Sequence, residues 1–113
     1  MQIEVQESVP GVTKIVLSGR IDITGAMAID GSMTTIARTC RALIIDLSGV
    51  EFMASMGLRS LVKCGKAIRG KQGRVVLLSP VHVVAEVIHA SGIDDLIPVC
   101  LSEAAALEAV TPP

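Results

Sequence analysis

The feature that most constrains this sequence is ALIIDL at residues 42–47, an apolar run with an acid near its end. A strand with one wet face would alternate apolar and polar residues, whereas this run has no alternation, so it suits a strand buried on both faces. RVVLL at residues 74–78 is a second run of this kind. Strands of this type belong to α/β proteins, in which helices cover the sheet. With 113 residues, half of them apolar, the chain suits one domain with a single core.

Segments with apolar residues at helical spacing separate the strand-like runs. Pro10 and Gly11 between the first two runs predict an antiparallel hairpin. The expected strands cover 3–9, 12–17, 42–47, 74–78 and 96–101, and the expected helices cover 24–38, 55–69, 80–90 and 103–110. The order β-β-α-β-α-β-α-β-α predicts an α/β fold with a mixed, mostly parallel sheet of about five strands and about four helices. We expect one domain over residues 1–113.

Ser55 lies between the strand-like run and the helix that follows it. In open sheets of this kind, functional crevices usually lie past the carboxyl ends of strands, where a loop meets a helix N-terminus. Serine is a favoured N-cap, so Ser55 could simply cap this helix. A helix N-terminus also accommodates a phosphate, because its N–H groups are unpaired and carry partial positive charge. Both interpretations of Ser55 remain open at this point.

Four stretches carry a resemblance to a known family: GRID at 19–22, LIIDLSGVEFMASMGL at 43–58, LLSP at 77–80 and SGIDDLIPV at 91–99. SEAAAL at 102–107 matches the family's usual last helix. In this order they resemble the STAS domain and, within it, the anti-sigma factor antagonists of bacteria. The resemblance spans nearly the whole chain and implies a STAS-like fold.

The resemblance also implies a site. Family antagonists carry, after the central strand, a serine that is phosphorylated by the anti-sigma factor, itself a serine kinase, and Ser55 matches this position. Asp22 matches a family acid near the acceptor. Ala54 departs from the family pattern by replacing an acid, and Met56 departs by replacing a second hydroxyl residue. The implied partner-binding surface consists of Asp22, Phe52, Met53, Ala54, Ser55, Met56, Gly57 and Leu58.

The function implied by this resemblance is that of an anti-sigma factor antagonist. Unphosphorylated, the chain would bind an anti-sigma factor and free the sigma factor. Phosphorylation of Ser55 would end that contact, and a serine phosphatase would restore it. The alternative is a non-phosphorylated STAS subunit of a membrane transporter, either an anion transporter or a lipid-trafficking ABC complex. In that case Val83 and Val87 would form a permanent interface.

Three further features lie near Ser55, and two of them have two interpretations. Met53 and Met56 line an adaptable binding surface or fill the core. Gly57 lets another backbone or a nucleotide approach closely. A basic helical stripe is a solvated face or meets an acidic patch on a partner; its members are Arg59, Lys63, Lys66 and Arg69.

Composition argues against several other functions. Ten basic residues balance eleven acidic ones, and Phe52 is the only aromatic residue, which leaves no stacking platform for nucleic acid. RVVLLSPVHVVAEVI is interrupted by polar residues and falls short of the roughly 20 residues that a membrane span needs. The start has no secretory signal pattern. Three scattered cysteines, Cys40, Cys64 and Cys100, indicate reduced thiols. We therefore expect a cytoplasmic protein without direct membrane insertion.

Catalysis and metal binding have weak signals. His82, Glu86 and His89 share one helical face and could hold a metal, but we favour an exposed polar stripe as their interpretation. Asp22 and Asp46 could form a carboxylate pair if they lie close together. The chain has neither GxxxxGK[ST] nor GxGxxG, so no dedicated nucleotide site is indicated. We expect no enzymatic activity, no cofactor and no metal.

Overall fold

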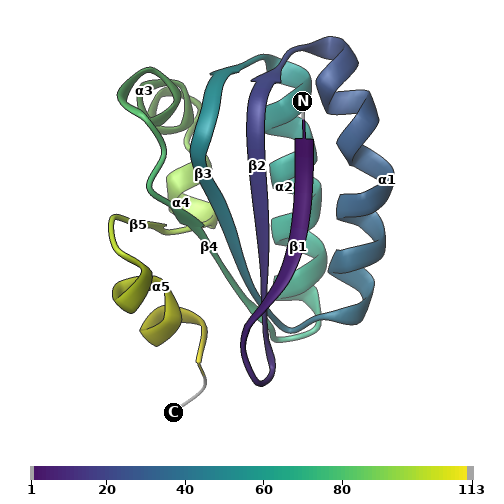
Figure 1. Cartoon of the computed structure of the whole chain (residues 1–113), viewed down its shortest axis with the longest axis vertical. Helices are drawn as coiled ribbons and strands as arrows, with labels where there is room; N and C mark the ends of the chain where they lie inside the picture. Colours follow the sequence, from purple (N-terminus) through teal and green to yellow (C-terminus); the bar gives the residue numbers. More distant parts are fainter. Residues whose placement is uncertain (1, 112–113) are drawn as a thin grey trace.

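The computed structural model describes residues 2–111 and confirms the predicted α/β fold, with a five-stranded sheet in the order β1-β2-β3-β4-β5 (Figure 1). Residue 1 and residues 112–113 of the expected domain lie outside the described residues. The elements are β1 (Gln2–Val9), β2 (Val12–Ile21), α1 (Ile23–Thr39), β3 (Ala42–Met53), α2 (Ser55–Gly70), β4 (Arg74–Leu78), α3 (His82–Ser91), α4 (Ile93–Leu96), β5 (Val99–Cys100) and α5 (Glu103–Val110).

The sheet is mixed, as the sequence predicts. β1 and β2 form the antiparallel hairpin, and Gly11 at its turn has a φ of 86°, which glycine adopts without strain. β3 is parallel to both of its neighbours, β2 and β4, and β5 is parallel to β4. The central run of β3 is buried on both faces, because Leu43 and Ile45 belong to one core cluster while Ile44 belongs to the other.

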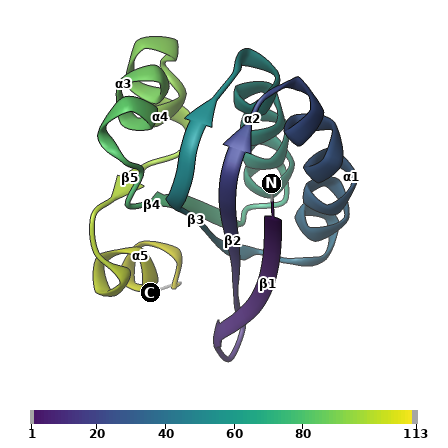
Figure 2. The same ribbon diagram turned by 45° about the horizontal axis from the view of Figure 1, so that its top comes forward.

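The two faces of the sheet are covered unequally. Both views place α1 beside α2, and α5 by itself near β4 and β5 (Figures 1 and 2). The larger cluster joins Ile15, Ile45 and Leu77 of the sheet to the apolar sides of α1, α2, α3 and α4. The smaller cluster joins Ile44 and Val76 to α5. The carboxyl ends of β2 and β3 lie beside the starts of α1 and α2, which follow these strands directly in the chain.

The expected end of the central strand was wrong. β3 continues to Met53, six residues past the expected end at 47, with two register irregularities against β2. The Asp46 carboxylate accepts hydrogen bonds from both the N–H and the Oγ of Ser48, so the polar residues that looked like a strand end are accommodated within the strand. As a result the central strand leads almost directly into α2.

The second half of the chain contains one more helix than expected. Gly92, with a φ of 79°, ends α3 in the left-handed conformation and begins the short helix α4, where a strand from 96 was expected. β5 consists of two residues only, because Pro98 has no N–H to donate. α3 begins at His82 rather than at Pro80, with Val81 as its N-cap.

Candidate functional site

The paired ends of β2 and β3 set the geometry of the candidate site. Ile21 lies opposite Met53 in the parallel register, and the Ala54 N–H donates to the Ile21 carbonyl at 2.8 Å. Asp22 follows Ile21 and caps α1, its carboxylate accepting a hydrogen bond from the Gly25 N–H at 2.8 Å. The fold therefore brings Asp22 and the segment 52–58 to one edge of the molecule, although about 30 residues separate them in the chain.

Ser55 is exposed and is the first residue of α2, not its cap. The N-cap is Ala54, in an extended conformation, and no side-chain hydrogen bond caps this helix. The interpretation of Ser55 as an N-cap is therefore wrong: a serine whose own backbone is already helical is one residue too late to cap. The first turn closes through the Gly57 and Leu58 N–H groups, which both donate to the Ala54 carbonyl. Within residues 2–111, the N–H groups of Ser55 and Met56 have no such backbone partner.

Two of the implied partner-binding residues are buried and cannot touch a partner directly. The Met53 side chain is 4% exposed and belongs to the core. A Cβ on Gly57 would lie 2.6 Å from Cγ2 of Ile21 and 3.1 Å from Cγ of Met53. The close approach at Gly57 is therefore made by the protein's own strand β2, which contradicts the expectation that an incoming backbone or nucleotide uses it. Met53 and Gly57 position the start of α2.

The remaining residues of the implied surface lie outside the core. Asp22, Phe52, Ser55 and Met56 are exposed, and Ala54 and Leu58 are half-buried. The Arg20 guanidinium lies over the Phe52 ring, 4.4 Å from its centroid, which is a cation–π distance. Of the two methionines, Met56 is the one that faces solvent, so the adaptable surface suggested for both is possible at Met56 alone.

Sequence reasoning missed two exposed apolar side chains on α1. Ile23 is 62% exposed and Met27 is 69% exposed. Their spacing of four residues, out of phase with the buried Ala26 and Ile29, is the signal that could have revealed them. Met27 and Met56 line a cavity of about 380 Å³ between α1 and α2. The exposed side chains of Ile23, Met27 and Met56 therefore form an apolar rim beside Ser55 on the side of α1.

The basic stripe of α2 is partly engaged within the chain. The Lys63 ammonium pairs with the Asp30 carboxylate on α1 at 3.1 Å, and the Arg69 guanidinium donates to the Leu96 carbonyl at 3.0 Å. Arg59 lines the cavity between α1 and α2, and Lys66 is exposed. The stripe is therefore not a uniform free cationic face, because two of its four members have partners in the fold.

The two histidines of α3 have different partners. His82 lies 2.8 Å from the Glu86 carboxylate, and His89 lies 2.8 Å from the Asp94 carboxylate in α4. The hydrogen bond to Asp94 raises the pKa of His89 above its ordinary value. Residues 2–111 contain no group of three histidine, cysteine, aspartate or glutamate side chains placed to hold a metal ion. The His82, Glu86 and His89 set is therefore not assembled as a metal site.

The other chemical groups are also kept apart or buried. Asp46 lies opposite Val16 in the middle of β2 and 3.7 Å from the Lys14 ammonium, whereas Asp22 follows the end of β2, so the two carboxylates do not form a pair. Burial raises the pKa of the Cys64 thiol to about 12, which makes it a poor nucleophile.

Among the described helices, none has the length and apolar composition to cross a bilayer.

Comparison with known proteins decides the family. The model of the STAS domain matches residues 2–106. The chain belongs to the STAS domain family. It is 33% identical over 85 residues to the anti-sigma-F factor antagonist RsfB of Mycobacterium tuberculosis, a match that covers 74% of this chain and 69% of that protein. The resemblance drawn from the sequence is thereby confirmed.

Solved structures agree with this assignment. An anti-sigma factor antagonist from Mycobacterium paratuberculosis superimposes with a TM-score of 0.86 at 31% identity, over 96% of this chain and 92% of that one. The Bacillus anti-sigma factor antagonist SpoIIAA, in its unphosphorylated form, gives a TM-score of 0.79 at 20% identity, over 95% of each chain. SpoIIAA has also been solved in its phosphorylated form, with a TM-score of 0.72 over 92% of this chain and 96% of that one. At this identity the SpoIIAA likeness is one of fold.

Proposed function

We propose that this STAS domain is a cytoplasmic anti-sigma factor antagonist that is switched by phosphorylation of Ser55. Unphosphorylated, it binds an anti-sigma factor that is a serine kinase, and so releases the sigma factor. The kinase supplies ATP and phosphorylates Ser55, and a serine phosphatase resets the switch. The chain is substrate and binder, with no chemistry of its own. RsfB, a relative at 33% identity, is named as an anti-sigma-F factor antagonist, which supports the antagonist role in this proposal.

The observation that carries the proposal is the position of Ser55 at the first residue of an uncapped helix. Ser55 is exposed, and the N–H groups of Ser55 and Met56 have no backbone partner among residues 2–111. A phosphate there adds nearly two negative charges beside unpaired donors and the positive end of the helix dipole. The fold therefore tolerates the modification.

The same phosphate weakens a docked partner. The exposed apolar side chains around Ser55, namely Phe52 and Met56 together with Ile23 and Met27 on α1, form the surface that a partner would cover. A dianion placed within such a contact adds bulk and must be desolvated, which costs a few kcal/mol, or about a hundredfold in affinity. The switch then acts on the interface and spares the domain.

The two departures from the family pattern bear on how the kinase recognises Ser55. Ala54 gives the kinase no carboxylate next to the acceptor, and Met56 contributes an apolar, adaptable side chain instead of a hydroxyl. Asp22, whose carboxylate caps α1, lies at the same edge. In this proposal the kinase recognises the site through Asp22 and the apolar rim.

The first test asks whether Ser55 is the acceptor. The chain is incubated with ATP and candidate serine-kinase anti-sigma factors from its own organism, and the intact mass is measured. The expected result is a gain of one phosphate that disappears in Ser55→Ala and persists in the control Ser102→Ala. A gain that persists in Ser55→Ala would place the phosphate elsewhere and refute the assignment.

The second test asks what the charge does to binding. Wild type, Ser55→Asp and the control Ser102→Asp are used as baits in native lysate, and the anti-sigma factor affinity is then measured with purified proteins. We expect Ser55→Asp to bind about a hundredfold more weakly and Ser102→Asp to bind like wild type. Stable co-purification with a membrane transporter, unaffected by Ser55→Asp, would instead support the transporter-subunit alternative.

A further inference from the structure

The outer edge of β4 is only partly paired. β3 pairs with β4 over its whole length, whereas β5 pairs with Leu77 and Leu78 alone. On this outer side the Leu77 N–H donates to the Pro98 carbonyl at 2.9 Å and the Ser79 N–H to the Cys100 carbonyl at 2.8 Å. Alternate residues of a strand direct their backbone groups to the same side. The N–H and C=O of Val75 therefore also face outward, where no strand of residues 2–111 pairs with them.

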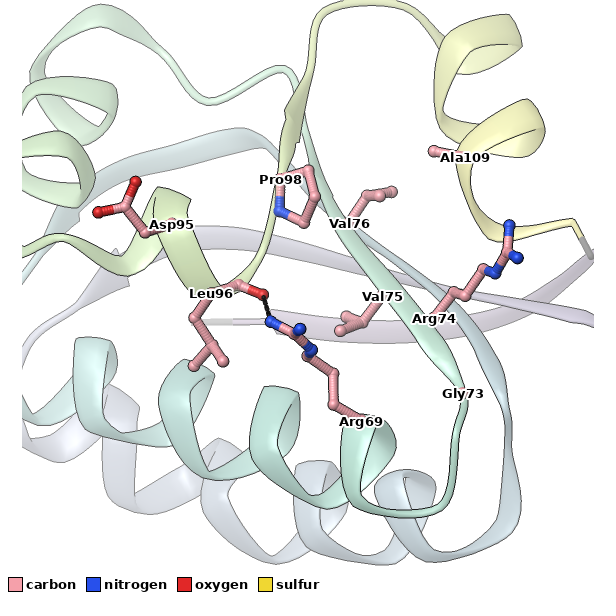
Figure 3. A pocket seen from close by; sticks show the side chains of 9 residues that line it. All are labelled: Arg69, Gly73, Arg74, Val75, Val76, Asp95, Leu96, Pro98 and Ala109. Atoms are coloured by element: carbon pink, nitrogen blue, oxygen red, sulfur yellow. Dashed lines mark hydrogen bonds between the residues drawn. The ribbon is translucent and has the colours of Figure 1, made fainter.

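The hydrogen-bonded pairing between β4 and β5 stops at Leu77 because the chain before β5 turns away from β4. Continuing the register would place the Leu96 carbonyl opposite the Val75 N–H. That carbonyl belongs to the end of α4 and accepts a hydrogen bond from Arg69 Nη1 at 3.0 Å (Figure 3). Val75 is only 4% exposed, so its outward backbone groups are screened from bulk water. Backbone groups in such a place normally have a partner.

A hollow of about 400 Å³ lies against this free edge. We name it the β4 edge groove and define it by Arg69, Arg74, Val75, Leu96, Pro98 and Ala109. Figure 3 shows Arg69 reaching from the end of α2 on one side and Arg74 extending toward α5 on the other. Both arginines are exposed, and a third charged residue, Asp95, lies at the margin and offsets part of their charge.

We propose that the β4 edge groove binds an extended, acidic segment of a partner protein, which adds a short strand to the sheet at Val75. Strand addition supplies main-chain hydrogen bonds, and the two arginines supply selectivity for carboxylates. Within the described residues each guanidinium donates once, Arg69 to Leu96 and Arg74 to Thr111, and so keeps further N–H donors.

The placement of the arginines specifies the peptide further. Successive side chains of a strand point to opposite faces of the sheet. Arg69 approaches from the α2 face, whereas Arg74 lies in the same alternation as Val76, which packs against α5. Two adjacent acidic residues would therefore each meet one arginine, whereas two acids separated by one residue would both point to the same face.

The first experiment tests whether the edge is free. Amide hydrogen exchange of the whole chain is followed residue by residue by NMR. The Val75 amide is expected to exchange on the order of a hundredfold faster than the Leu77 amide, since only Leu77 has a strand partner. Equal protection of the two amides in the free chain, whether from an internal bond or from self-association at this edge, would overturn the proposal.

The second experiment uses capped hexapeptides as probes. The labelled chain is titrated with Ac-TVEEVT-NH2, and the expected result is a saturable shift of the Val75 amide signal with slowed exchange. Three comparison peptides are each expected to bind about tenfold more weakly. They are Ac-TVEEVT-NH2 with both glutamates N-methylated, the uncharged Ac-TVQQVT-NH2, and Ac-TEVEVT-NH2, in which the two acids are separated by one residue. Binding of all four peptides with equal affinity, or no shift at Val75, would overturn the proposal.

Protein variants complete the test. Arg74→Gln is expected to lower the affinity for Ac-TVEEVT-NH2 about tenfold. The matched control is Arg59→Gln, which changes an exposed arginine of α2 outside the groove and is expected to leave the affinity unchanged. Ser55→Asp is also expected to leave the affinity for Ac-TVEEVT-NH2 unchanged, so the test of this groove is independent of the proposed switch at Ser55. Loss of binding in Arg59→Gln equal to that in Arg74→Gln would show non-specific attraction and overturn the site.

Discussion

The starts of α2 and α5 differ in how a nearby serine is used. At α5, Ser102 is the N-cap, and its Oγ accepts a hydrogen bond from the Ala105 N–H at 3.2 Å. At α2, the cap position belongs to Ala54, and Ser55 lies one residue inside the helix with its hydroxyl exposed. The difference teaches that a shift of one residue converts a serine from a structural cap into a group available for modification.

The start of α2 is held by packing, and the largest predicted effect follows from that. Gly57→Ala would place its Cβ 2.6 Å from Cγ2 of Ile21, so we expect a loss of about 1–3 kcal/mol in the free energy of unfolding. The control Gly31→Ala, in α1 with no atom within 4 Å of the added Cβ, should gain about 0.5–1 kcal/mol. Urea denaturation measures both, and an unchanged midpoint for Gly57→Ala would show that β2 does not restrain α2.

The second prediction tests the contrast between the two serines directly. Ser102→Ala removes a cap and should cost about 1 kcal/mol, whereas Ser55→Ala removes an exposed hydroxyl and should stay within about 0.5 kcal/mol of wild type. Paired urea denaturation curves measure the difference. Equal losses would mean that Ser55 stabilises α2 after all, and would remove the contrast.

The third prediction supplies the missing cap. Ala54→Asp would give α2 a carboxylate able to accept from the N–H of Met56 or Gly57, so we expect a gain of about 0.5–1 kcal/mol. The gain should be read from thermal and urea unfolding, with Ala54→Asn as a cap of similar size without charge. A loss of stability in both variants would show that these N–H groups are not accessible from position 54.

The smallest expected effect concerns a helix end held by charge. The pKa of His89, in the last turn of α3, is raised chiefly by its hydrogen bond to Asp94 and lies above 6.5. The stabilisation from this pair is therefore complete below the unfolded-state pKa and is lost as the pH rises through the raised pKa. NMR titration should show a lower His89 pKa in Asp94→Asn and a smaller change in Asp95→Asn. Equal titration curves for wild type and Asp94→Asn would contradict the pairing.

The sequence predicted the parts of the fold that depend on long patterns. The hairpin at Pro10 and Gly11, the doubly buried strand and the helix after Ser55 each rest on several residues that agree. The segment 93–100 was harder, because its apolar spacing suits a strand as well as a single helical turn, and the left-handed Gly92 decides the outcome. Short elements carry too little periodicity for the sequence to distinguish them.

The sequence predicted where the candidate residues lie in the fold, but not their detailed geometry. Family motifs located Ser55 correctly at the start of a helix, yet the choice between cap and first helical residue depends on a boundary that sequence patterns define only within a residue or two. Burial of Met53 and Gly57 could not be read from the sequence, because it depends on Ile21 of a distant strand. Ile23 and Met27 were missed because α1 is apolar on more than one side.

The junction between Ile21 and Asp22 has a consequence for where the chain accepts changes in length. The Ile21 carbonyl receives the Ala54 N–H, and the next residue, Asp22, caps α1. Inserting one amino acid there would displace the origins of two helices simultaneously, whereas extra residues between Pro10 and Gly11 would only enlarge an exposed loop. A reporter tag or an added epitope therefore belongs in the hairpin, far from the edge where Ser55 lies.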